Sequence, residues 1–399
     1  MKNEDFSMFS KETQLLYSGN SVAGCSLSPE APPLFLASAF LIDGDLDDVS
    51  KAYEKEDYTY IRTRNPNRNM LAETISLLED SESSAVFSSG MGAITTSLFA
   101  FLKAGDHILA SDTLYGETIE MLADMPKYGI EVDFVDFTDI DKVEKGFKPN
   151  TKVVYSETIS NPKITIIDVE EIAKLSHING AIFIVDNTFG TPLCIKCIDL
   201  GADIVINSLT KFMNGHCDAL LGSVSGKKEL VDKVIAKQWL FGTTGGTFSS
   251  WLVLRGLRTL SLRYEKQMEN ARLLADALSR NPYVLKVNYP TVDGYPQAEL
   301  AKKLFSGNGY GAMLSFEMPK GQREKMNDFM KRLKLVHYAP TLGGIRTTMS
   351  HPATSSHSEL TEEERLAIGI TDGMMRVSVG IENIDDLIKD FNQALEAYK

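Results

Sequence analysis

The sequence reads DIVINSLTKFMNGHCD from Asp203 to Asp218, and this stretch decides how the rest of the chain is interpreted. An apolar run typical of a buried strand ends at Ser208, and Thr210 and Lys211 follow before a Gly-containing loop. A lysine in such a loop is ordinarily a solvated charge. Lys211 becomes a candidate nucleophile only if the neighbouring runs form a sheet whose carboxyl edge it joins.

Short apolar runs alternate with helical patterns from about residue 84 to residue 226. The runs read HILA (107–110), VDFVDF (132–137), KVVYS (152–156), AIFIVD (181–186), DIVINS (203–208) and LLGSVSG (220–226). Amphipathic segments such as DVEEIAKLSHING (168–180) lie between several of them. This alternation predicts an α/β fold with a mainly parallel sheet wrapped by helices. In such sheets the ligand binds beyond the carboxyl ends of the strands.

The pattern changes near residue 256. A long helical stretch (262–282), a strand-like run AMLSFEM (312–318) and a closing helix (383–398) predict a smaller α/β domain. We therefore expect three parts: an N-terminal arm (1–62), a large domain (63–255) and a C-terminal small domain (256–399). The arm is irregular but too apolar to be disordered, so we expect it to pack on a neighbouring subunit.

Composition excludes several classes of protein. The chain has 399 residues, 43% of them hydrophobic and 24% charged, which is enough for more than one core. Its formal net charge of −13 and the lack of a basic tract disfavour nucleic acid as a partner. No run of 18 apolar residues occurs, and the start MKNEDFSMFSK lacks the long apolar stretch that a signal peptide is expected to have. We therefore expect a cytoplasmic protein without a membrane partner.

The cysteines predict neither a disulfide framework nor a metal site. Four cysteines in so long a chain are too few for the former. Cys194 and Cys197 have CxxC spacing, but zinc needs a second ligand pair, for which Cys217 beside His216 is the only candidate. We interpret the pair as two ordinary reduced thiols.

A carboxylate and an amine end two successive runs. AIFIVD delivers Asp186, and DIVINS leads to Lys211, 25 residues later. The amine can form an imine with an aldehyde cofactor, while the carboxylate keeps that cofactor's ring nitrogen protonated. Taken alone, Asp186 would more simply be a helix cap or a turn residue.

A small-residue turn upstream favours the cofactor interpretation. The strand-like SAVFSS (84–89) runs through Ser89, Gly90 and Met91 into a helix. The free amides of such a helix start can bind a phosphate, with the helix dipole assisting. Ser208 and Thr210 could supply further donors. A turn of this kind could also merely ease helix–sheet packing.

Three more residues follow strand-like runs or lie within one. Tyr115 follows HILA and could stack on a pyridine ring, or could simply plug the core. Asn161 follows KVVYS and could bind a ring hydroxyl. Arg376 lies within the run MMRVSVG, where a substrate carboxylate would suit its guanidinium. The late pattern GNGYGA (307–312) precedes a strand instead of linking strand to helix, so a nicotinamide site is disfavoured.

The ordered motifs together resemble the Cys/Met-metabolism group of pyridoxal-phosphate enzymes, which includes methionine γ-lyase and cystathionine γ-lyase. The resemblance rests on YIRTRNP (60–66), FSSGMGAI (87–94), LYGET (114–118), ETISNP (157–162), VDNTFGTP (185–192), GADIVINSLTKFMNGHCD (201–218), RGLRTL (255–260), HPATSSHS (351–358) and MMRVSVGIEN (374–383). It implies the aspartate-aminotransferase-like fold type I, with a seven-stranded large-domain sheet, and a homotetramer whose active sites are shared between subunits.

The resemblance also implies roles for individual residues toward pyridoxal 5'-phosphate (PLP). Lys211 would form the imine and carry protons, Asp186 would pair with the ring nitrogen, and Tyr115 would stack on the ring. Asn161 would contact the ring hydroxyl, and Arg376 and Thr341 would contact the substrate. The phosphate would be held by Ser89, Gly90, Met91, Ser208 and Thr210. Tyr60 and Arg62 would reach the site of a neighbouring subunit. Glu157 would only support the site.

The chain departs from the family pattern around the distal end of the substrate. Glu117 follows Gly116 where methionine γ-lyases usually have cysteine, and Pro340 stands where cystathionine γ-lyases and γ-synthases usually have an acid. Arg346 stands where many members have glutamate, and Ile159 replaces a usual proline. Glu117 and Arg346 could form a structural ion pair or be unrelated surface charges. Alternatively, Glu117 could attract a cationic distal group.

The expected activity is that of a carbon–sulfur lyase. It would eliminate the γ-thiol of methionine, homocysteine or cystathionine and yield a 2-oxo acid and ammonia. Pro340 favours elimination over synthesis, because no acid stands there to receive a second amino acid's ammonium. The alternatives are γ-replacement, β-elimination from cystathionine or cysteine, and a non-catalytic regulator that has the same fold.

Overall fold

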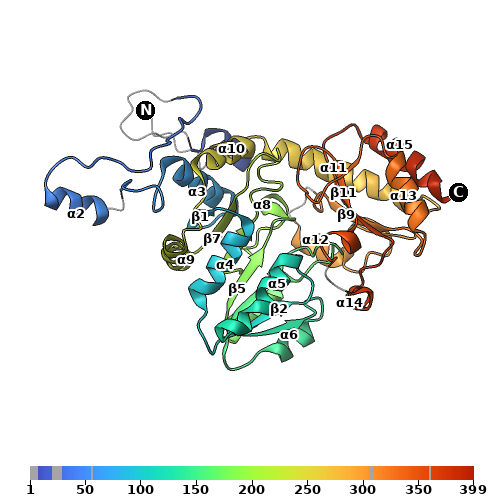
Figure 1. The fold of residues 1–399 in the computed structure, drawn as a ribbon, viewed down its shortest axis with the longest axis horizontal. Coiled ribbons are helices and arrows are strands. Elements are labelled where there is room, and N and C mark those ends of the chain that lie inside the picture. The colour runs from blue at the N-terminus through green and yellow to red at the C-terminus, as the bar shows by residue number, and fades with distance from the viewer. Residues whose placement is uncertain (1–7, 20–28, 55–56, 306–308, 359–360) are drawn as a thin grey trace.

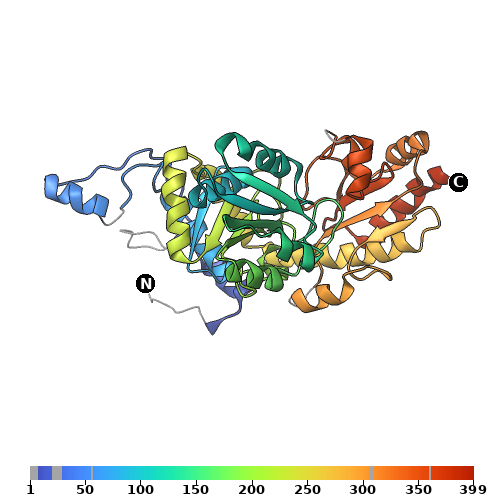
Figure 2. The same ribbon diagram turned by 90° about the horizontal axis from the view of Figure 1, so that it is seen from below.

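A computed structural model describes residues 8–19, 29–54, 57–305, 309–358 and 361–399. Figure 1 shows a central body built on one large sheet, with the C-terminal part at one end and the N-terminal arm at the other. Figure 2 shows the same order from below. Parts of the expected arm, and two residues of the GNGYGA pattern, lie outside the described residues.

The large sheet has seven strands in the order β1-β7-β6-β5-β4-β2-β3. Their bounds are β1 Ser83–Phe87, β2 His107–Ser111, β3 Glu131–Val135, β4 Thr151–Glu157, β5 Ile182–Asp186, β6 Ile204–Asn207 and β7 Gly222–Gly226. The strands β2 to β6 pair in parallel, whereas β7 is antiparallel to both β6 and β1. The predicted mainly parallel sheet is confirmed, and β1 points the same way as β6.

Both faces of this sheet are buried, as the continuous apolar runs predict. Successive side chains of β5 join different clusters: Phe183 and Val185 belong to one core and Ile184 to the other. The first face is covered by α3 Pro66–Glu79, α6 Ile140–Gly146, α7 Val169–Ile178, α8 Thr191–Cys194 and α10 Thr247–Leu257. The second face is covered by α4 Gly90–Phe101, α5 Gly116–Asp124 and α9 Lys228–Phe241.

A long helix, α11 (Leu260–Ser279), leads from the large sheet to the C-terminal part. Its first half contributes Tyr264 and Met268 to the core of the large sheet, while Leu274 and Leu278 belong to the C-terminal core. The predicted boundary at residue 256 stays a prediction, because this helix is shared by both cores.

The C-terminal part contains a five-stranded sheet in the order β10-β11-β12-β9-β8. Its strands are β8 Lys286–Asn288, β9 Met313–Glu317, β10 His337–Tyr338, β11 Thr348–Ser350 and β12 Met374–Ser378. Its helices are α12 Ala298–Leu304, α13 Arg323–Arg332, α14 Glu362–Ala367 and α15 Ile384–Leu395. The strand β12 pairs with both β11 and β9, so Arg376 lies on a central strand.

The described part of the N-terminal arm contains the helices α1 (Lys11–Tyr17) and α2 (Leu46–Glu54). In Figure 1, α2 stands away from the body. None of its residues is buried, and the arm exposes apolar side chains such as Leu41 and Leu46, at 98% and 82% of their surface. Large apolar side chains left this exposed typically mark a surface that another chain covers.

Candidate active site

A single edge of the large sheet gathers the residues singled out above. The strands β1, β2, β4, β5 and β6 all end there, because they point in the same direction. A cavity of about 440 Å³ opens at this edge, and the C-terminal part closes it with Thr341 and Arg376. Twelve of the fourteen predicted site residues line it: Ser89, Gly90, Met91, Tyr115, Glu117, Asn161, Asp186, Ser208, Thr210, Lys211, Thr341 and Arg376.

Lys211 lies on a tight turn just past β6. Its backbone N–H donates to the Ser208 carbonyl at 3.1 Å, and its own carbonyl accepts from the Gly215 N–H at 2.8 Å. Burial first, and then the Arg376 guanidinium, lower the pKa of the Lys211 amine. A lowered pKa increases the neutral, nucleophilic fraction of a lysine. The amine that the sequence indicated is therefore placed and tuned for addition to an aldehyde.

Asp186 ends β5 beside Glu157, its register partner on β4. The Thr188 N–H donates to Asp186 Oδ1 at 2.8 Å. Burial raises the pKa of Asp186 to about 6, whereas burial and the neighbouring Asp186 raise the pKa of Glu157 well above its usual range. Glu157 consequently holds its proton, and Asp186 is the carboxylate of the pair. A cationic ring nitrogen in the cavity would stabilise that charge.

The start of α4 forms the predicted anion cradle. The Ser89 hydroxyl caps the helix by accepting from the Gly92 N–H at 2.9 Å, which leaves the amides of Gly90 and Met91 at the cavity. A Cβ on Gly90 would lie 3.1 Å from the Ser208 Cβ, so a side chain there would crowd the space between α4 and Ser208. Backbone donors and the helix dipole suit a phosphate at this point.

Thr210 contributes less to this cradle than the sequence predicts. Its hydroxyl donates to the Leu221 carbonyl at 3.2 Å and accepts from the Leu221 N–H at 3.1 Å. A hydroxyl has one proton to donate, so this one is engaged with the backbone. A contact from Thr210 to a phosphate stays a prediction and would require that proton to be redirected.

Tyr115 is held at the cavity by a neighbouring acid. The Glu157 Oε1 accepts from the Tyr115 backbone N–H at 2.6 Å. Burial, followed by a hydrogen bond with the Glu117 side chain, raises the pKa of the Tyr115 phenol. The ring is 36% exposed and lines the cavity, so it is open to a ligand. The alternative that Tyr115 plugs the core is wrong.

Asn161 and Arg376 both line the cavity and contact each other. The Arg376 Nη1 donates to Asn161 Oδ1 at 2.8 Å, and Nη2 approaches the Thr341 carbonyl at 3.5 Å. Burial lowers the pKa of the Arg376 guanidinium to about 10, so it stays charged at neutral pH. No acid among the described residues forms an ion pair with this buried cation, which therefore suits a carboxylate ligand.

Tyr60 and Arg62 do not line the cavity of their own chain. Arg62 Nη1 donates to the Trp239 carbonyl at 2.6 Å, and its guanidinium carbon lies 5.7 Å from the centroid of the Tyr60 ring. Tyr60 is 48% exposed. The location of this pair on the surface is compatible with the expectation that they serve another subunit.

Glu117 and Arg346 lie in different surroundings. Glu117 lines the cavity, whereas Arg346 is exposed and is not among the lining residues. Within the described part of the chain no ion pair joins them. The structural ion pair considered above is absent there, and Glu117 remains a charge that faces the cavity. Pro340 lines the cavity as well.

Sequence reasoning missed several residues that shape this site. The Thr188 hydroxyl accepts from the Ser208 N–H at 2.7 Å and thereby joins the ends of β5 and β6. A Cβ on Gly343 would lie 2.4 Å from the Phe212 nitrogen, so Gly343 packs against the lysine turn. Ser356 also lines the cavity. Thr188 lies in the motif VDNTFGTP and Ser356 in HPATSSHS, and Gly343 follows Pro340 and Thr341 in the stretch PTLGG (340–344), but the contacts of these residues depend on tertiary structure.

The donor set fits PLP. The cavity offers an amine of lowered pKa, an acidic side chain, a helix start with free amides, an aromatic face and a buried arginine, all within about 440 Å³. That volume lies in the usual range for cofactor sites. No group of three or more His, Cys, Asp or Glu side chains in the described residues could hold a metal ion. The cavity is therefore organised for an organic, anionic cofactor.

Comparisons with known proteins agree with this chemistry. A family model described as "Cys/Met metabolism PLP-dependent enzyme" matches residues 12–396. The L-methionine gamma-lyase of Fusobacterium nucleatum subsp. polymorphum is 41% identical over 371 residues, which cover 92% of this chain and 93% of that protein. The cystathionine beta-lyase MetC of Bacillus subtilis (strain 168) is 43% identical over 341 residues, covering 85% and 86%.

A solved structure has the same fold. It is the cystathionine gamma synthase from Xanthomonas oryzae pv. oryzae in complex with aminoacrylate and cysteine. Its TM-score is 0.92 at 33% sequence identity, and the match covers 98% of each chain. The fold class expected from the sequence is confirmed.

Proposed function

The chain belongs to the Cys/Met-metabolism family of PLP-dependent enzymes and is a carbon–sulfur lyase, and on that premise we propose that it removes the γ-thiol of a sulfur amino acid. The substrates that suit this site are methionine, homocysteine and cystathionine. The products are a thiol, ammonia and a 2-oxo acid. The observation that carries the proposal is the convergence of Lys211, Asp186 and Arg376 on one cavity.

PLP, when bound, supplies an aldehyde for the substrate amine and a protonated pyridine that draws electrons from the substrate's backbone carbon. Asp186 keeps the ring nitrogen protonated through its negative charge. The amides of Gly90 and Met91 hold the phosphate at the start of α4. Tyr115 would stack on the ring and Asn161 would bind its hydroxyl, and both side chains line the cavity.

Lys211 and Tyr60 of the partner subunit move the protons of this reaction. With the cofactor bound, Lys211 would take the proton from the substrate Cα, return it to the cofactor–substrate adduct, and as a neutral amine again remove one from Cβ; its lowered pKa suits it to this role. The C–S bond breaks with its electron pair on sulfur, and Tyr60 of the partner subunit donates the proton that completes the thiol. Water then releases the 2-oxo acid and ammonia. Arg376 orients the substrate by binding its α-carboxylate in a bidentate fork.

The part of the cavity expected to face the distal end of the substrate favours elimination over replacement. Pro340 lines the cavity where a second amino acid's ammonium would need an acid, and a prolyl ring provides no charge. Two relatives named as lyases are 41% and 43% identical to this chain, whereas the synthase of known structure is 33% identical to it, which also supports elimination. β-Elimination remains the second candidate, because the MetC relative is named as a β-lyase.

The substrate class can be narrowed through Glu117. It is the acid on the substrate side of the cavity, and it hydrogen-bonds the Tyr115 phenol. A carboxylate there attracts a substrate whose distal end carries an ammonium, as cystathionine does. We therefore place cystathionine ahead of methionine.

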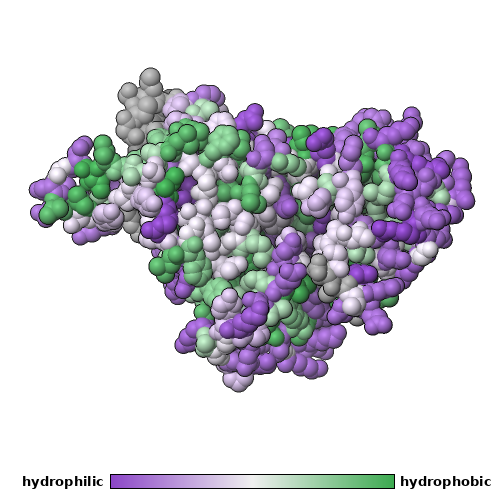
Figure 3. Space-filling view, in the orientation of Figure 1, coloured by the Kyte–Doolittle hydropathy of each residue, from purple (hydrophilic) through white to green (hydrophobic). Residues whose placement is uncertain are grey.

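A homotetramer with shared sites is part of the proposal. The exposed apolar side chains of the arm, visible as green surface around α2 in Figure 3, support coverage by another subunit. Tyr60 and Arg62, outside the cavity of their own chain, are then free to enter a partner's cavity. None of the helices in the described part of the chain combines the length and apolar character that a membrane crossing requires.

The test is to identify the 2-oxo acid that each substrate yields. Purified holoenzyme is incubated with methionine, homocysteine, cystathionine and cysteine, and the released acids are separated by mass. γ-Elimination gives a four-carbon 2-oxo acid and β-elimination gives pyruvate. Lys211→Ala should abolish both, whereas Lys227→Ala, an exposed lysine outside the cavity, should change neither. Replacement products without any 2-oxo acid would refute the proposed reaction.

A further inference from the structure

A buried acid outside the cavity contacts the strand that leads to Lys211. Glu79 is the last residue of α3 and is 1% exposed. Asn207 is the last residue of β6 and is 0% exposed. The Asn207 Nδ2 donates to Glu79 Oε1 at 2.6 Å. The pair therefore joins a helix of the first face to the end of β6.

The second side-chain oxygens of Glu79 and Asn207 raise a hydrogen-bonding problem. Within the described residues, neither Glu79 Oε2 nor Asn207 Oδ1 has a hydrogen-bond partner, and both atoms are buried. An ionised carboxylate and an amide oxygen can only accept, so they cannot satisfy each other. Buried acceptors left in this condition are costly, particularly when one carries a charge.

A single proton removes the conflict. We propose that Glu79 is a neutral carboxylic acid in the folded enzyme and forms a two-bond ring with the Asn207 amide, which positions the end of β6 and thus Lys211. In this ring the amide N–H donates to Oε1, and the acid O–H donates to Oδ1. The proton on Oε2 thus supplies the donor that these two oxygens lack.

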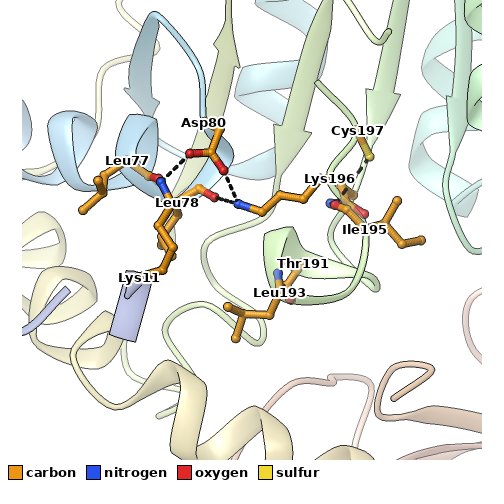
Figure 4. A network of polar contacts seen from close by, with 10 residues as sticks. Lys11, Leu77, Leu78, Asp80, Thr191, Leu193, Ile195, Lys196 and Cys197 are labelled. Carbon is orange, nitrogen blue, oxygen red and sulfur yellow. Dashed lines mark hydrogen bonds and ion pairs between the residues drawn. The ribbon is translucent and has the colours of Figure 1, made fainter. Parts of the chain in front are cut away.

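The nearby cations do not neutralise Glu79 by direct contact. The Lys196 ammonium donates to the Leu78 carbonyl at 2.5 Å and to Asp80 Oδ2 at 2.7 Å. Figure 4 shows Lys11 and Lys196 converging on Asp80, which follows Glu79 in the chain. These ammonium groups are bound to a different carboxylate. In the part of the chain that the structure describes, Glu79 has no bonded counter-ion.

The remaining charges around Glu79 agree with a neutral acid. The pKa of Glu79 is raised to about 7, mainly by burial and to a lesser extent by Asp80, although the Asn207 hydrogen bond and the Lys196 charge oppose the rise. The Cys197 thiol faces the same space, and burial together with Glu79 raises its pKa. Besides Lys196, then, the titratable groups around Glu79 are an acid and a thiol, neither of which favours ionisation.

The proton has a predictable effect on stability and on cofactor retention. The pKa of Glu79 is raised from 4.5 to about 7 on folding, so the unfolded chain gives up this proton first as the pH rises. The stability of the fold should fall between these two values and change no further above them. Loss of the ring also loosens the end of β6, so PLP should leave faster at alkaline pH. Only this last consequence rests on the proposed role of Lys211.

Infrared spectra of the holoenzyme test the proton directly. A protonated carboxyl absorbs at a higher C=O frequency than a carboxylate. We expect wild type near pH 6 to have one such band that Glu79→Gln lacks and Glu144→Gln retains. Glu144 is an exposed residue of α6, so it matches the charge change without the ring. The band should vanish as the pH rises through about 7.

Denaturant unfolding and PLP release complete the experiment. Glutamine reproduces the ring, because its amide can accept from and donate to Asn207. Glu79→Gln should therefore fold. Its unfolding midpoint should match that of wild type near pH 5 and exceed it at pH 8. At pH 8 the variant should also lose PLP several-fold more slowly than wild type. An unfolded Glu79→Gln protein, or a missing infrared difference, would overturn the proposal because the charged carboxylate would then be required. A difference in stability without one in PLP release would confirm the proton and refute its link to Lys211.

Discussion

Arg376 on β12 donates a hydrogen bond of 2.8 Å to Asn161, although the two residues are 215 positions apart in the chain. The bond joins the C-terminal part to the loop that follows β4. It orients the guanidinium toward the cavity and presents the Asn161 amide at the same wall. The proposed contacts of Arg376 with the substrate and of Asn161 with the cofactor therefore share this hydrogen bond.

Arg376→Lys should impair substrate binding while leaving the cofactor in place. Lysine retains the charge but loses the planar fork and the bond to Asn161. Loss of one charge-assisted hydrogen bond costs about 2 kcal/mol, which corresponds to roughly a thirty-fold decrease in kcat/KM. Steady-state kinetics and the visible spectrum measure both effects. Arg346→Lys, at an exposed site outside the cavity, is the control and should change neither.

Asp186→Asn should have opposite effects on the apoenzyme and on cofactor binding. The pKa of Asp186 is raised from 3.8 to about 6, so the unfolded chain loses this proton first and apoenzyme stability falls as the pH rises through that window. Asparagine does not ionise, so it removes this loss of stability. The loss is of order 1–3 kcal/mol above pH 6, because each pKa unit is worth about 1.4 kcal/mol. It also removes the negative charge that the ring nitrogen requires.

Denaturant titrations of the apoenzyme at pH 5 and pH 8, with PLP affinity measured alongside, check this prediction. Asp186→Asn should gain stability at pH 8 and gain less at pH 5, while binding PLP more weakly. Asp199→Asn, at an exposed position, controls for a general change of charge. A variant that loses apoenzyme stability at pH 8 would contradict the role of burial.

Glu117→Gln should alter the ranking of substrates. Glu117 is exposed toward the cavity, so the attraction it exerts on a distal ammonium is worth about 1 kcal/mol, or roughly five-fold in kcat/KM. Turnover of cystathionine should fall by that factor, and turnover of methionine should not. Added salt should weaken the preference in wild type. Glu120→Gln, one turn along α5 and exposed, is the matched control, and an unchanged ranking in Glu117→Gln would exclude Glu117 as the cause.

The sequence predicted those features of the fold that depend on local pattern. Apolar runs located the strands of the large sheet within a few residues. VDFVDF overextends β3, which ends at Val135, and HILA stops one residue short of Ser111, where β2 ends. The run LLGSVSG forms β7, which is antiparallel to its neighbours. Strand direction depends on connections and not on hydrophobic period, so the run alone could not indicate it.

The candidate site was predictable because parallel strands bring their carboxyl ends together. Lys211, Asp186 and Tyr115 each follow such a strand, and the rule on ligand sites sufficed to group them. The competing bond of Thr210 to Leu221, the separation of Glu117 from Arg346 and the buried pair of Glu79 with Asn207 were not predictable. Each depends on which side chains meet across elements, information that no local pattern contains.

The last prediction concerns the contact of Gly343 with the lysine turn. Gly343 has φ +81°, and a Cβ there would lie 2.4 Å from the Phe212 nitrogen and 2.9 Å from the Lys211 Cα. Gly343→Ala therefore combines backbone strain with a collision against main-chain atoms that cannot rotate away. Gly242 has φ +71° with no atom within 4 Å, so Gly242→Ala incurs the strain alone.

The difference between these two variants isolates the contact. We expect Gly242→Ala to lose about 1 kcal/mol of stability with normal PLP binding. Gly343→Ala should lose at least twice as much and should bind PLP weakly, because the collision displaces the turn that orients Lys211. Unfolding midpoints and PLP titrations measure both. Equal losses, with PLP affinity retained, would mean that the turn relaxes around the added methyl group and that Gly343 does not position Lys211.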